Sequence, residues 1–468
     1  MEIGHEERRT DMVGLAMTSS STISDVSNAV TREDVAASAP TGDDDRNVDS
    51  AALYRKLFWR LTPLIVAGCI IAYIDRVNVG IAKLQFSEQL GFDEAVYGTG
   101  AGLFYAGYLL LEVPSNLLLE RVGARLTLMR IMVLWGLISA AMAFVHTATH
   151  FYVLRFLLGA AEAGFFPGVV LYLSYWFPPE LRGRITAYFM MGLAVAGIIG
   201  GPISGWLMGL EGLHGLHGWQ VLFIYEGLPA CLLGIVYYFA LSDRPASATW
   251  LNDAEKRFLS HATMTVSSPA PARPRSIAGQ LLKEPRIYVF AFSYISVIAG
   301  TQAVALWSPT LLGKIGYQTA FIGALSAIPY AVALMCMFLL GRSSDRRMER
   351  RWHFTGAMWV AAASLMLLGA VGGNALLTIS LLALAAGGAL SAMALFWTIP
   401  PTELPPEIKA SGIAVVSSFG AVGGFLSPII VGTLSKYTGS LYYGLDVVGL
   451  MLFCSGAILV IFTRRGMR

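Results

Sequence analysis

Long apolar runs recur along the chain and are separated by short polar stretches. A run of about 20 apolar residues is what an α-helix needs to cross a bilayer. We expect twelve such helices. The first six runs lie near 61–82, 95–117, 126–145, 150–173, 185–209 and 219–241, and the second six near 287–312, 319–341, 353–372, 375–398, 410–434 and 441–463. The pattern predicts an all-α membrane protein of twelve transmembrane helices in two six-helix halves.

Polar segments divide this pattern. The first 50 or so residues carry serine, threonine and acidic clusters without an apolar core, which indicates a disordered tail and not a signal peptide. A proline-rich basic stretch separates the sixth run from the seventh. The predicted organisation is a cytosolic tail over 1–52, a six-helix bundle over 53–241, a cytosolic linker over 242–285, a second bundle over 286–463 and a cytosolic C-terminus over 464–468.

The two halves repeat each other. Glu120-Arg121 after the second run is echoed by Asp345-Arg346 after the eighth, an offset of 225 residues. The Pro-Pro-Glu-Leu-Arg stretch over 178–182 recurs as Pro-Pro-Glu-Ile-Lys over 405–409, and Pro202 is matched by Pro428. These coincident offsets indicate a duplicated protein with parallel halves, which places a substrate site near the membrane midplane between them.

Composition agrees with a membrane protein. Hydrophobic residues make up 55% of the chain and charged residues 13%, about half the ~25% typical of soluble domains. The four cysteines lie inside apolar runs without metal-ligand spacing, so they are interpreted as packing residues. The motifs of serine hydrolases, zinc proteases and P-loop enzymes are absent from the sequence, so an enzyme is not expected. We expect no cofactor, no metal and no nucleic acid partner.

Lysine and arginine concentrate in alternate loops. One set carries most of them, whereas the opposite loops carry little beyond Lys83, Lys314 and Lys436. By the positive-inside rule, both termini and the linker are predicted to be cytosolic.

Four charges inside the apolar runs are the strongest candidates for function. Asp75 and Arg76 lie in the first run, and Arg155 and Glu162 share one face of the fourth, about 10.5 Å apart along the axis. Each such charge costs roughly 2.5–3.5 kcal/mol to insert, so it is kept where it faces protein or water. A buried guanidinium can bind a carboxylate with two hydrogen bonds. The alternative is a set of internal ion pairs that only allows the bundle to insert.

Several sequence blocks resemble a known family. The loop after the eighth run, Gly341 to Arg347, is similar to the signature of the major facilitator superfamily. Within that superfamily the chain resembles the anion:cation symporters. The blocks that carry the resemblance are Ile74 to Val79, Glu112 to Asn116, Arg155 to Gly168, Tyr175 to Pro178, Glu226 to Pro229 and Phe396 to Pro400, and it covers about residues 55–465. It implies the major facilitator fold and proton-coupled import of an organic anion. The similar bacterial members take up tartrate, sugar acids or aromatic carboxylates, which implies the bacterial inner membrane.

The resemblance also implies roles for single residues. Asp75 and Glu162 match the proton-coupling acids, and Tyr108 is expected to face the substrate, although a packing role is almost as plausible. Burial favours the protonated carboxyl and a neighbouring arginine the ionised one, so an anion that occupies the arginine can change proton affinity. Arg155 is the expected substrate ligand, and Arg76 either binds substrate or gates the outer vestibule. Glu226 is interpreted as a structural charge that bonds a neighbouring loop.

The second half contributes little charge, and its candidate contacts are uncharged. They are Gln302, Trp307, Trp397 and Ser417. The family commonly has a tyrosine in place of Gln302 and an asparagine in place of Ser417. This departure favours a smaller or more aromatic carboxylate over a sugar acid, unless it is simple drift.

Two loop clusters are expected to gate the transporter. Glu120 with Arg121, and Asp345 with Arg346, are predicted to lock the outward-open state at the cytosolic face. The chain is expected to act as a monomer in the bilayer, on a small organic anion and protons. The alternative function is efflux of a drug or metabolite by proton antiport. The two intramembrane arginines argue against a cationic cargo.

Overall fold

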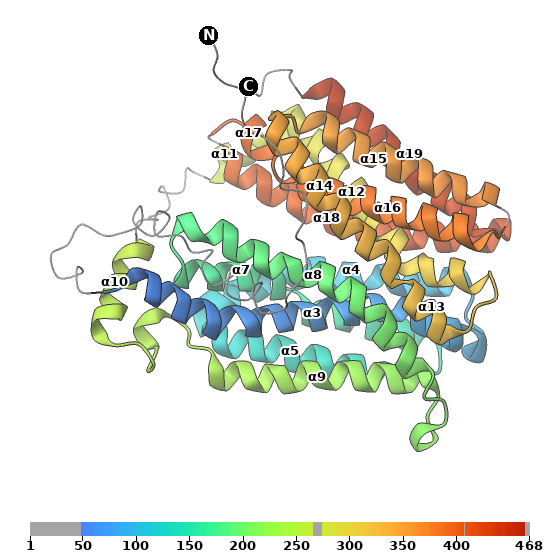
Figure 1. The fold of residues 1–468 in the computed structure, drawn as a ribbon, viewed down its shortest axis with the longest axis horizontal. Coiled ribbons are helices and arrows are strands. Elements are labelled where there is room, and N and C mark those ends of the chain that lie inside the picture. Colours follow the sequence, from blue (N-terminus) through green and yellow to red (C-terminus); the bar gives the residue numbers. More distant parts are fainter. Residues whose placement is uncertain (1–47, 265–273, 372, 407, 464–468) are drawn as a thin grey trace, which may run out of the picture.

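The computed structural model describes residues 48–264, 274–371, 373–406 and 408–463. Helices account for the regular structure of these residues, and twelve segments are long and apolar enough to cross a membrane. They form two bundles that lie side by side, one from each half of the chain (Figure 1). The predicted all-α fold with twelve spans is confirmed. Residues 1–47 and 464–468, which include most of the predicted tail, lie outside the described residues.

The first half supplies six spans, two of which are interrupted. Its helices are α3 (Ser50–Leu90), α4 (Glu94–Val122), α5 (Ala124–Ala141) with η2 (Met142–Phe144), α6 (Ala148–Glu162) with α7 (Phe165–Trp176), α8 (Pro179–Met208), η3 (Leu213–Gly215) and α9 (Gly218–Ala240).

The second half supplies the other six. Its helices are α12 (Pro285–Gly313), α13 (Thr319–Leu325) with α14 (Ala327–Arg347), α15 (Arg351–Leu367) with η5 (Leu368–Val371), α16 (Ala375–Phe396) with α17 (Pro400–Glu403), α18 (Lys409–Thr438) and α19 (Leu441–Phe462).

The first helix is much longer than the apolar run that predicts it. Helix α3 has 41 residues, which is about 60 Å of helix against a hydrocarbon core of about 30 Å. The Asp49 side chain caps its first turn by accepting from the Ala52 N–H at 3.1 Å. The extra turns mix charged and other polar residues with aliphatic and aromatic ones, so their mean hydropathy falls below that of the apolar run.

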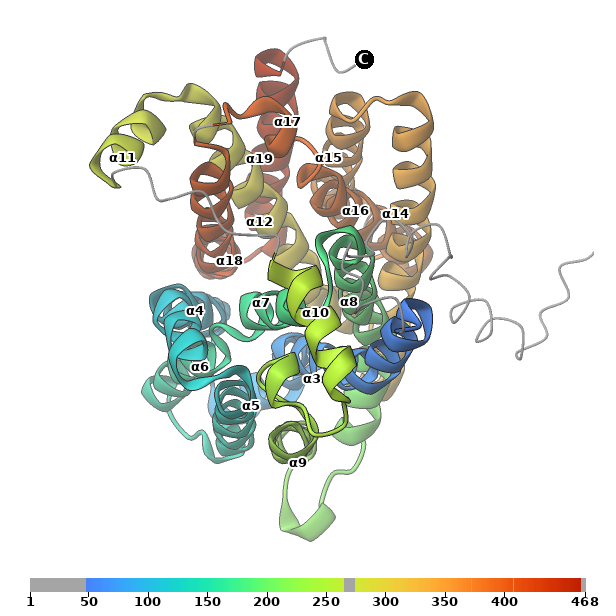
Figure 2. The same ribbon diagram turned by 90° about the vertical axis from the view of Figure 1, so that its left-hand side faces the viewer.

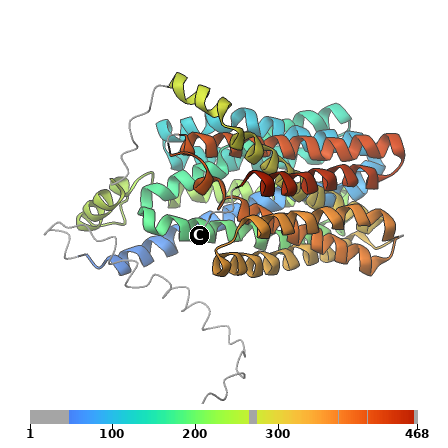
Figure 3. The same cartoon turned by 90° about the horizontal axis from the view of Figure 1, so that it is seen from above.

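The linker between the halves is partly helical. It contains η4 (Pro245–Ser247), α10 (Asp253–Met264) and α11 (Pro274–Lys283), with 265–273 outside the described residues. Helix α10 lies against the first bundle, where Phe258 packs on Tyr54 of α3 with ring centroids 6.2 Å apart. Helix α11 lies at the end of the second bundle, beside α12 and α18 (Figures 2 and 3).

The two bundles meet mainly at one end. We call the end that carries Arg121, Arg346 and α10 the basic end, and the end that carries Lys83 and Lys436 the opposite end. Helix α4 packs on α18, and α8 packs on α13. In Figure 1 the bundles lie close together near α13 and diverge toward α10.

Candidate functional site

Two guanidinium groups gather around one aromatic ring in the first bundle. The Arg76 guanidinium carbon lies 5.4 Å from the centroid of Phe104, and that of Arg155 lies 5.0 Å from it. Arg76 also lies 5.5 Å from the ring of Tyr108. The two arginines come from α3 and α6 and the ring from α4, so three helices converge here. Cation–π attraction to a shared ring offsets part of the cost of keeping two positive charges close together.

Arg76 is ion-paired, whereas the salt bridges among the described residues do not include Arg155. Arg76 Nη2 donates to Glu162 Oε1. Arg155 is 1% exposed, and its Nε and Nη1 atoms are buried without a hydrogen-bond partner in the described part of the chain. Glu162 Oε2 and Arg76 Nε also lack partners. Buried donors without partners are rare, so this cluster has the hydrogen-bonding capacity to hold an anion.

A helix break sets the position of Glu162. The fourth span is predicted as one continuous run, but the structure divides it into two helices. Helix α6 ends at Glu162, and α7 begins at Phe165. Gly164 between them has a φ of +88°, which a residue with a Cβ adopts only with strain. A Cβ there would also lie 2.6 Å from Ser115 of α4. Interrupted helices of this kind commonly line the substrate sites of secondary transporters.

Asp75 takes part in a second set of hydrogen bonds, which connects α3 to α5. It is 1% exposed, and its Oδ1 atom accepts from the Ser139 hydroxyl of α5. Asn78 Nδ2 lies 3.4 Å from the same oxygen, and Asp75 Oδ2 is buried without a partner. The structure therefore does not join Asp75 to Arg76, its neighbour in sequence, but to hydroxyl and amide groups.

Glu226 extends this network, contrary to its interpretation as a charge that bonds a loop. It lies within α9 and is 6% exposed. Its Oε2 accepts from Asn78 Nδ2 at 2.8 Å and its Oε1 from the Ser204 hydroxyl at 2.7 Å. Both partners belong to spanning helices, so Glu226 is an intramembrane carboxyl.

The predicted contacts from the second half are dispersed. Trp307 is fully buried against Tyr97 of α4, with ring centroids 5.2 Å apart. Trp397 packs on Tyr294, Gln302 is buried in α12, and Ser417 is exposed on α18. Among the described residues, the recorded contacts do not join Gln302, Trp397 or Ser417 to the guanidinium groups. Their assignment to the substrate remains a prediction.

The predicted gating clusters are exposed at the basic end. Asp345 pairs with Arg350 of its own half at 3.1 Å, and Glu120, Arg121 and Arg346 are exposed. Within the described ranges, the recorded ion pairs at this end do not connect the two halves. This arrangement fits a conformation in which the basic end is not locked.

The opposite end is closed by contacts between the halves. Lys83 is 5% exposed, pairs with Glu94 and donates to the Thr310 hydroxyl at 3.1 Å. Its Nζ atom lies 4.5 Å from the ring centroid of Tyr97 and 4.3 Å from that of Trp307. We call these five residues, of which Thr310 and Trp307 belong to the second half, the lysine seam.

A surface ion pair lies beside the lysine seam. Lys436 of α18 pairs with Asp93, the N-cap of α4, at 2.9 Å. The Val96 N–H, together with the Lys436 ammonium, holds the pKa of Asp93 below its usual range. A carboxyl with a lowered pKa stays ionised at neutral pH and loses the pair only as the pH falls through that lowered value. This contact between the halves is therefore intact at neutral pH.

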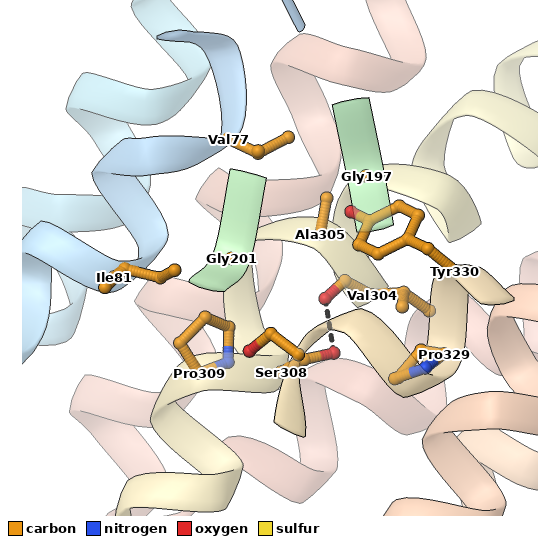
Figure 4. Close-up of a pocket in the computed structure, with 11 residues that line it drawn as sticks. Val77, Ile81, Gly197, Gly201, Val304, Ala305, Ser308, Pro309, Pro329 and Tyr330 are labelled. Carbon is orange, nitrogen blue, oxygen red and sulfur yellow. Dashed lines mark hydrogen bonds between the residues drawn. The ribbon is translucent and has the colours of Figure 1, made fainter. Parts of the chain in front are cut away.

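A pocket lined by uncharged, mostly apolar residues lies between the halves. It is formed by α3, α8, α12 and α14, with Val77, Gly197, Val304, Pro329 and Tyr330 among its lining residues (Figure 4). The Ser308 hydroxyl in its wall donates to the Val304 carbonyl at 2.6 Å. The lining residues carry no charge, so this pocket is not suited to bind a carboxylate.

Sequence reasoning missed the residues that connect the predicted charges. Phe104 lies four positions before Tyr108, on the same face of α4, and Asn78 lies three positions after Asp75. Helical spacing alone could have placed both near the site. Ser139 and Ser204 gave no signal, because a serine in an apolar run more often bonds its own helix backbone.

The two six-helix bundles with intramembrane charges have the architecture of a secondary transporter, and the matching family consists of transporters and not of enzymes. The chain belongs to the Major Facilitator Superfamily, whose family model matches residues 65–428. It is a multi-pass membrane protein.

Related proteins cover nearly the whole chain. It is 40% identical to the "Putative tartrate transporter" of Agrobacterium vitis, over 88% of this chain and 92% of that one. It is 41% identical to the "Putative metabolite transport protein NicT" of Pseudomonas putida, over 89% of this chain and 96% of that one. It is 37% identical to a quinolone resistance transporter of Acinetobacter baumannii, over 85% of this chain and 92% of that one.

The fold is shared with solved transporters of low sequence identity. The inward-open structure of the xylose transporter XylE from E. coli matches with a TM-score of 0.67 at 14% identity, over 87% of this chain and 96% of that one.

Proposed function

We propose that this protein imports an organic anion together with protons, by alternating access, across a bacterial inner membrane. The cargo is a mono- or dicarboxylate of the tartrate or aromatic-carboxylate class. The single observation that carries the proposal is Arg155, a buried guanidinium with two unpartnered nitrogens beside a second arginine. The uncharged candidate contacts of the second half agree with a small or aromatic acid, and the tartrate name of the Agrobacterium vitis relative supports the same class.

The proposed coupling rests on the neighbouring acids. Glu162 shares its helix with Arg155 and is bonded by Arg76, so an anion that occupies the arginines removes the groups that keep it ionised. Asp75 has an unpartnered oxygen that can accept a proton. Proton and anion together neutralise the site, and a neutral site can be occluded as the bundles rock. Any uncompensated charge would be driven by roughly 2.3 kcal/mol per 100 mV.

Orientation is part of the proposal. The concentration of arginine at the basic end supports a cytosolic position for that end and for both termini. The lysine seam then closes the periplasmic side. The conformation described above corresponds to an inward-facing state, in which cargo leaves toward the cytosol.

The first experiment tests the cargo. The purified protein is screened by thermal shift against mono- and dicarboxylates, each paired with its uncharged amide. Stabilisation by an acid and not by its amide is the expected result, since a bound ligand raises stability in proportion to the logarithm of its concentration over Kd. Equal stabilisation by acid and amide would remove the basis of the anion assignment.

The second experiment tests the coupling. Uptake of the identified acid into proteoliposomes should rise with an inward proton gradient and collapse with an uncoupler. Uptake driven equally well by sodium at uniform pH would contradict proton coupling.

Efflux by proton antiport is the second candidate, favoured by the quinolone resistance relative and by the aromatic rings around the guanidiniums. It predicts that fluoroquinolones stabilise the protein and that an outward drug flux follows an inward proton gradient. Stabilisation by simple carboxylates alone would decide against it.

A further inference from the structure

The Asp75 network contains a carboxyl that the proposed function does not use. Glu226 on α9 is linked to Asp75 on α3 through one side chain, Asn78, whose Nδ2 lies 2.8 Å from Glu226 Oε2 and 3.4 Å from Asp75 Oδ1. Asn78 is fully buried, and the two acids are 6% and 1% exposed. Two carboxyls therefore face each other across a single buried amide.

Positive charge does not compensate for both acids. Among the helices packed on α9, α3 brings Asp75 and Arg76, while α5 and α8 bring the hydroxyls of Ser139 and Ser204 to this network. Arg76 is already paired with Glu162. Arg155 of α6, beside the Phe104 ring, is the second guanidinium of the site, and Arg130 of α5 donates to the Ser115 hydroxyl at 3.1 Å. Within the described residues, the recorded salt bridges include neither Asp75 nor Glu226. Three carboxyls thus share two guanidiniums, and an uncompensated buried carboxylate is strongly disfavoured.

The hydrogen bonds of Glu226 suit a neutral acid. A serine hydroxyl can accept as well as donate, so a proton on Glu226 Oε1 can be donated to Ser204 Oγ at 2.7 Å. Glu226 Oε2 then continues to accept from Asn78 Nδ2, and both oxygens of the acid have partners. Asp75 differs, because its Oδ1 receives the Ser139 hydroxyl and its Oδ2 has no partner. One oxygen of Asp75 is stabilised as an anion and the other is free to receive a proton.

We propose that Glu226 carries a resident proton throughout the transport cycle and positions Asn78 toward Asp75, so that only Asp75 of this pair exchanges protons. The second amide hydrogen of Asn78 is then directed at Asp75 and favours its ionised form until a proton arrives. With Glu226 neutral, the charges of Asp75 and Glu162 balance those of Arg76 and Arg155 in the empty site. When the cargo anion binds Arg155, it neutralises positive charge that favours the ionised form of Asp75, and a proton then adds to Asp75 Oδ2. Glu226 is a positioning residue, and its role in transport rests on the proposed proton coupling.

The variant that separates a resident proton from a moving one is Glu226→Gln. Glutamine reproduces the neutral acid, because its NH₂ can donate to Ser204 and its oxygen can accept from Asn78. Proton-driven uptake by this variant should stay within about twofold of wild type, since each hydrogen bond is replaced in kind. The matched control, Asp75→Asn, makes the same isosteric change across Asn78 and should abolish concentrative uptake.

The protonation state has a direct readout. At alkaline pH the exposed carboxyls are ionised, so a C=O stretching band of a protonated carboxylic acid in the infrared spectrum reports buried acids only. Wild type in an ester-free detergent should retain such a band, Asp75→Asn should retain it as well, and Glu226→Gln should lose it. If wild type lacks the band, or if Glu226→Gln keeps it, Glu226 does not hold the proton and the inference is wrong.

The outcomes distinguish this inference from the proposed function. If Glu226→Gln stops proton-driven uptake as completely as Asp75→Asn does, Glu226 is a titrating acid and the resident proton is refuted. If Asp75→Asn still accumulates substrate, the proposed coupling through Asp75 fails, while the infrared band still decides the state of Glu226.

Discussion

Arg155 is the residue on which the organic-anion assignment depends. It is buried, it lies 5.0 Å from the Phe104 ring, and two of its nitrogens lack partners among the described residues. Lysine keeps the positive charge but loses the two-pronged geometry that matches a carboxylate. Arg155→Lys should therefore weaken carboxylate binding ten- to a hundred-fold, which corresponds to roughly 1.5–3 kcal/mol for a charge-assisted hydrogen bond. Calorimetric titration of wild type and variant with one acid measures this.

The uncharged amide of the same acid is the control for that titration. Wild type should bind the amide much more weakly, and Arg155→Lys should bind it about as weakly as wild type does. If Arg155→Lys binds the acid with the affinity of wild type, Arg155 does not recognise the carboxylate group.

Asp75 is the residue at which binding and energy coupling can be separated. Asp75→Asn keeps the size of the side chain and its hydrogen bond from Ser139 but cannot take up a proton. Concentrative uptake should be lost while exchange of labelled for unlabelled substrate is retained, because exchange needs no net proton movement. Both are measured on the same proteoliposomes. Accumulation against a gradient by this variant would exclude Asp75 as a coupling acid.

The sequence identified the charges of the site but not their partners. A charged side chain is costly to insert into a bilayer, so few charges lie within apolar runs. A single sequence is therefore enough to identify Asp75, Arg76, Arg155 and Glu162 as candidates. Pairing depends on how far each helix is rotated about its axis, which the apolar pattern of a buried bundle leaves open. Adjacent positions on α3 therefore became members of two networks, Arg76 with Glu162 and Asp75 with Asn78.

At the scale of the helix, the site depends on how closely α4 and α6 approach. A Cβ at Gly159 would lie 1.8 Å from the Phe104 carbonyl oxygen, and one at Gly107 would lie 2.1 Å from that of Phe156. Small residues allow helix backbones in membranes to pack at this distance. The same contact holds Phe104 between the two guanidiniums.

Gly159→Val should separate these helices. Overpacking of this kind costs typically about 1–3 kcal/mol, and the variant should lower the unfolding temperature and weaken carboxylate binding together. The matched control is Gly183→Ala in α8, where a Cβ meets nothing within 4 Å and where alanine favours the helix. Thermal unfolding in detergent compares the two. A wild-type unfolding temperature for Gly159→Val would mean that the close approach is not required.

At the same scale, hydropathy predicted the helices better than their interruptions. Each of the twelve predicted runs overlaps one span of the structure, but the break at Gly164 and the turn between α13 and α14 at Ser326 fall within continuous apolar sequence. Such breaks depend on tertiary contacts, for example the close approach of Gly164 to Ser115. The apolar pattern of a sequence does not predict such contacts.

At the scale of the whole molecule, the repeat predicted two halves but not which end of them is closed. Both conformations of an alternating-access protein use the same sequence, and a hydropathy pattern carries no preference between them. The structure closes the opposite end with the lysine seam and with glycines on α4 and α18. A Cβ at Gly98 would lie 2.2 Å from the Pro428 carbonyl oxygen.

Gly98→Leu should prevent this closure. The variant should stay open at the opposite end, bind substrate from the outside and fail to transport it. Labelling of a cysteine introduced at Thr310 by a membrane-impermeant thiol reagent reports the accessibility of the seam, and it should increase. Gly356→Leu, at a position where a Cβ meets nothing within 4 Å, is the control and should transport normally. Normal transport by Gly98→Leu would contradict the assigned closure.

The lysine seam has an optical consequence. Trp307 is fully buried with the Lys83 ammonium 4.3 Å from its ring, and these two residues belong to opposite halves. When the halves separate, the Trp307 indole becomes exposed to water and loses its contact with the Lys83 ammonium. Its fluorescence emission should then shift to longer wavelength. The chain has ten tryptophans, so the difference between wild type and Trp307→Phe isolates this signal. We therefore expect the emission of Trp307 to follow the opening and closing of the opposite end in real time, without a label.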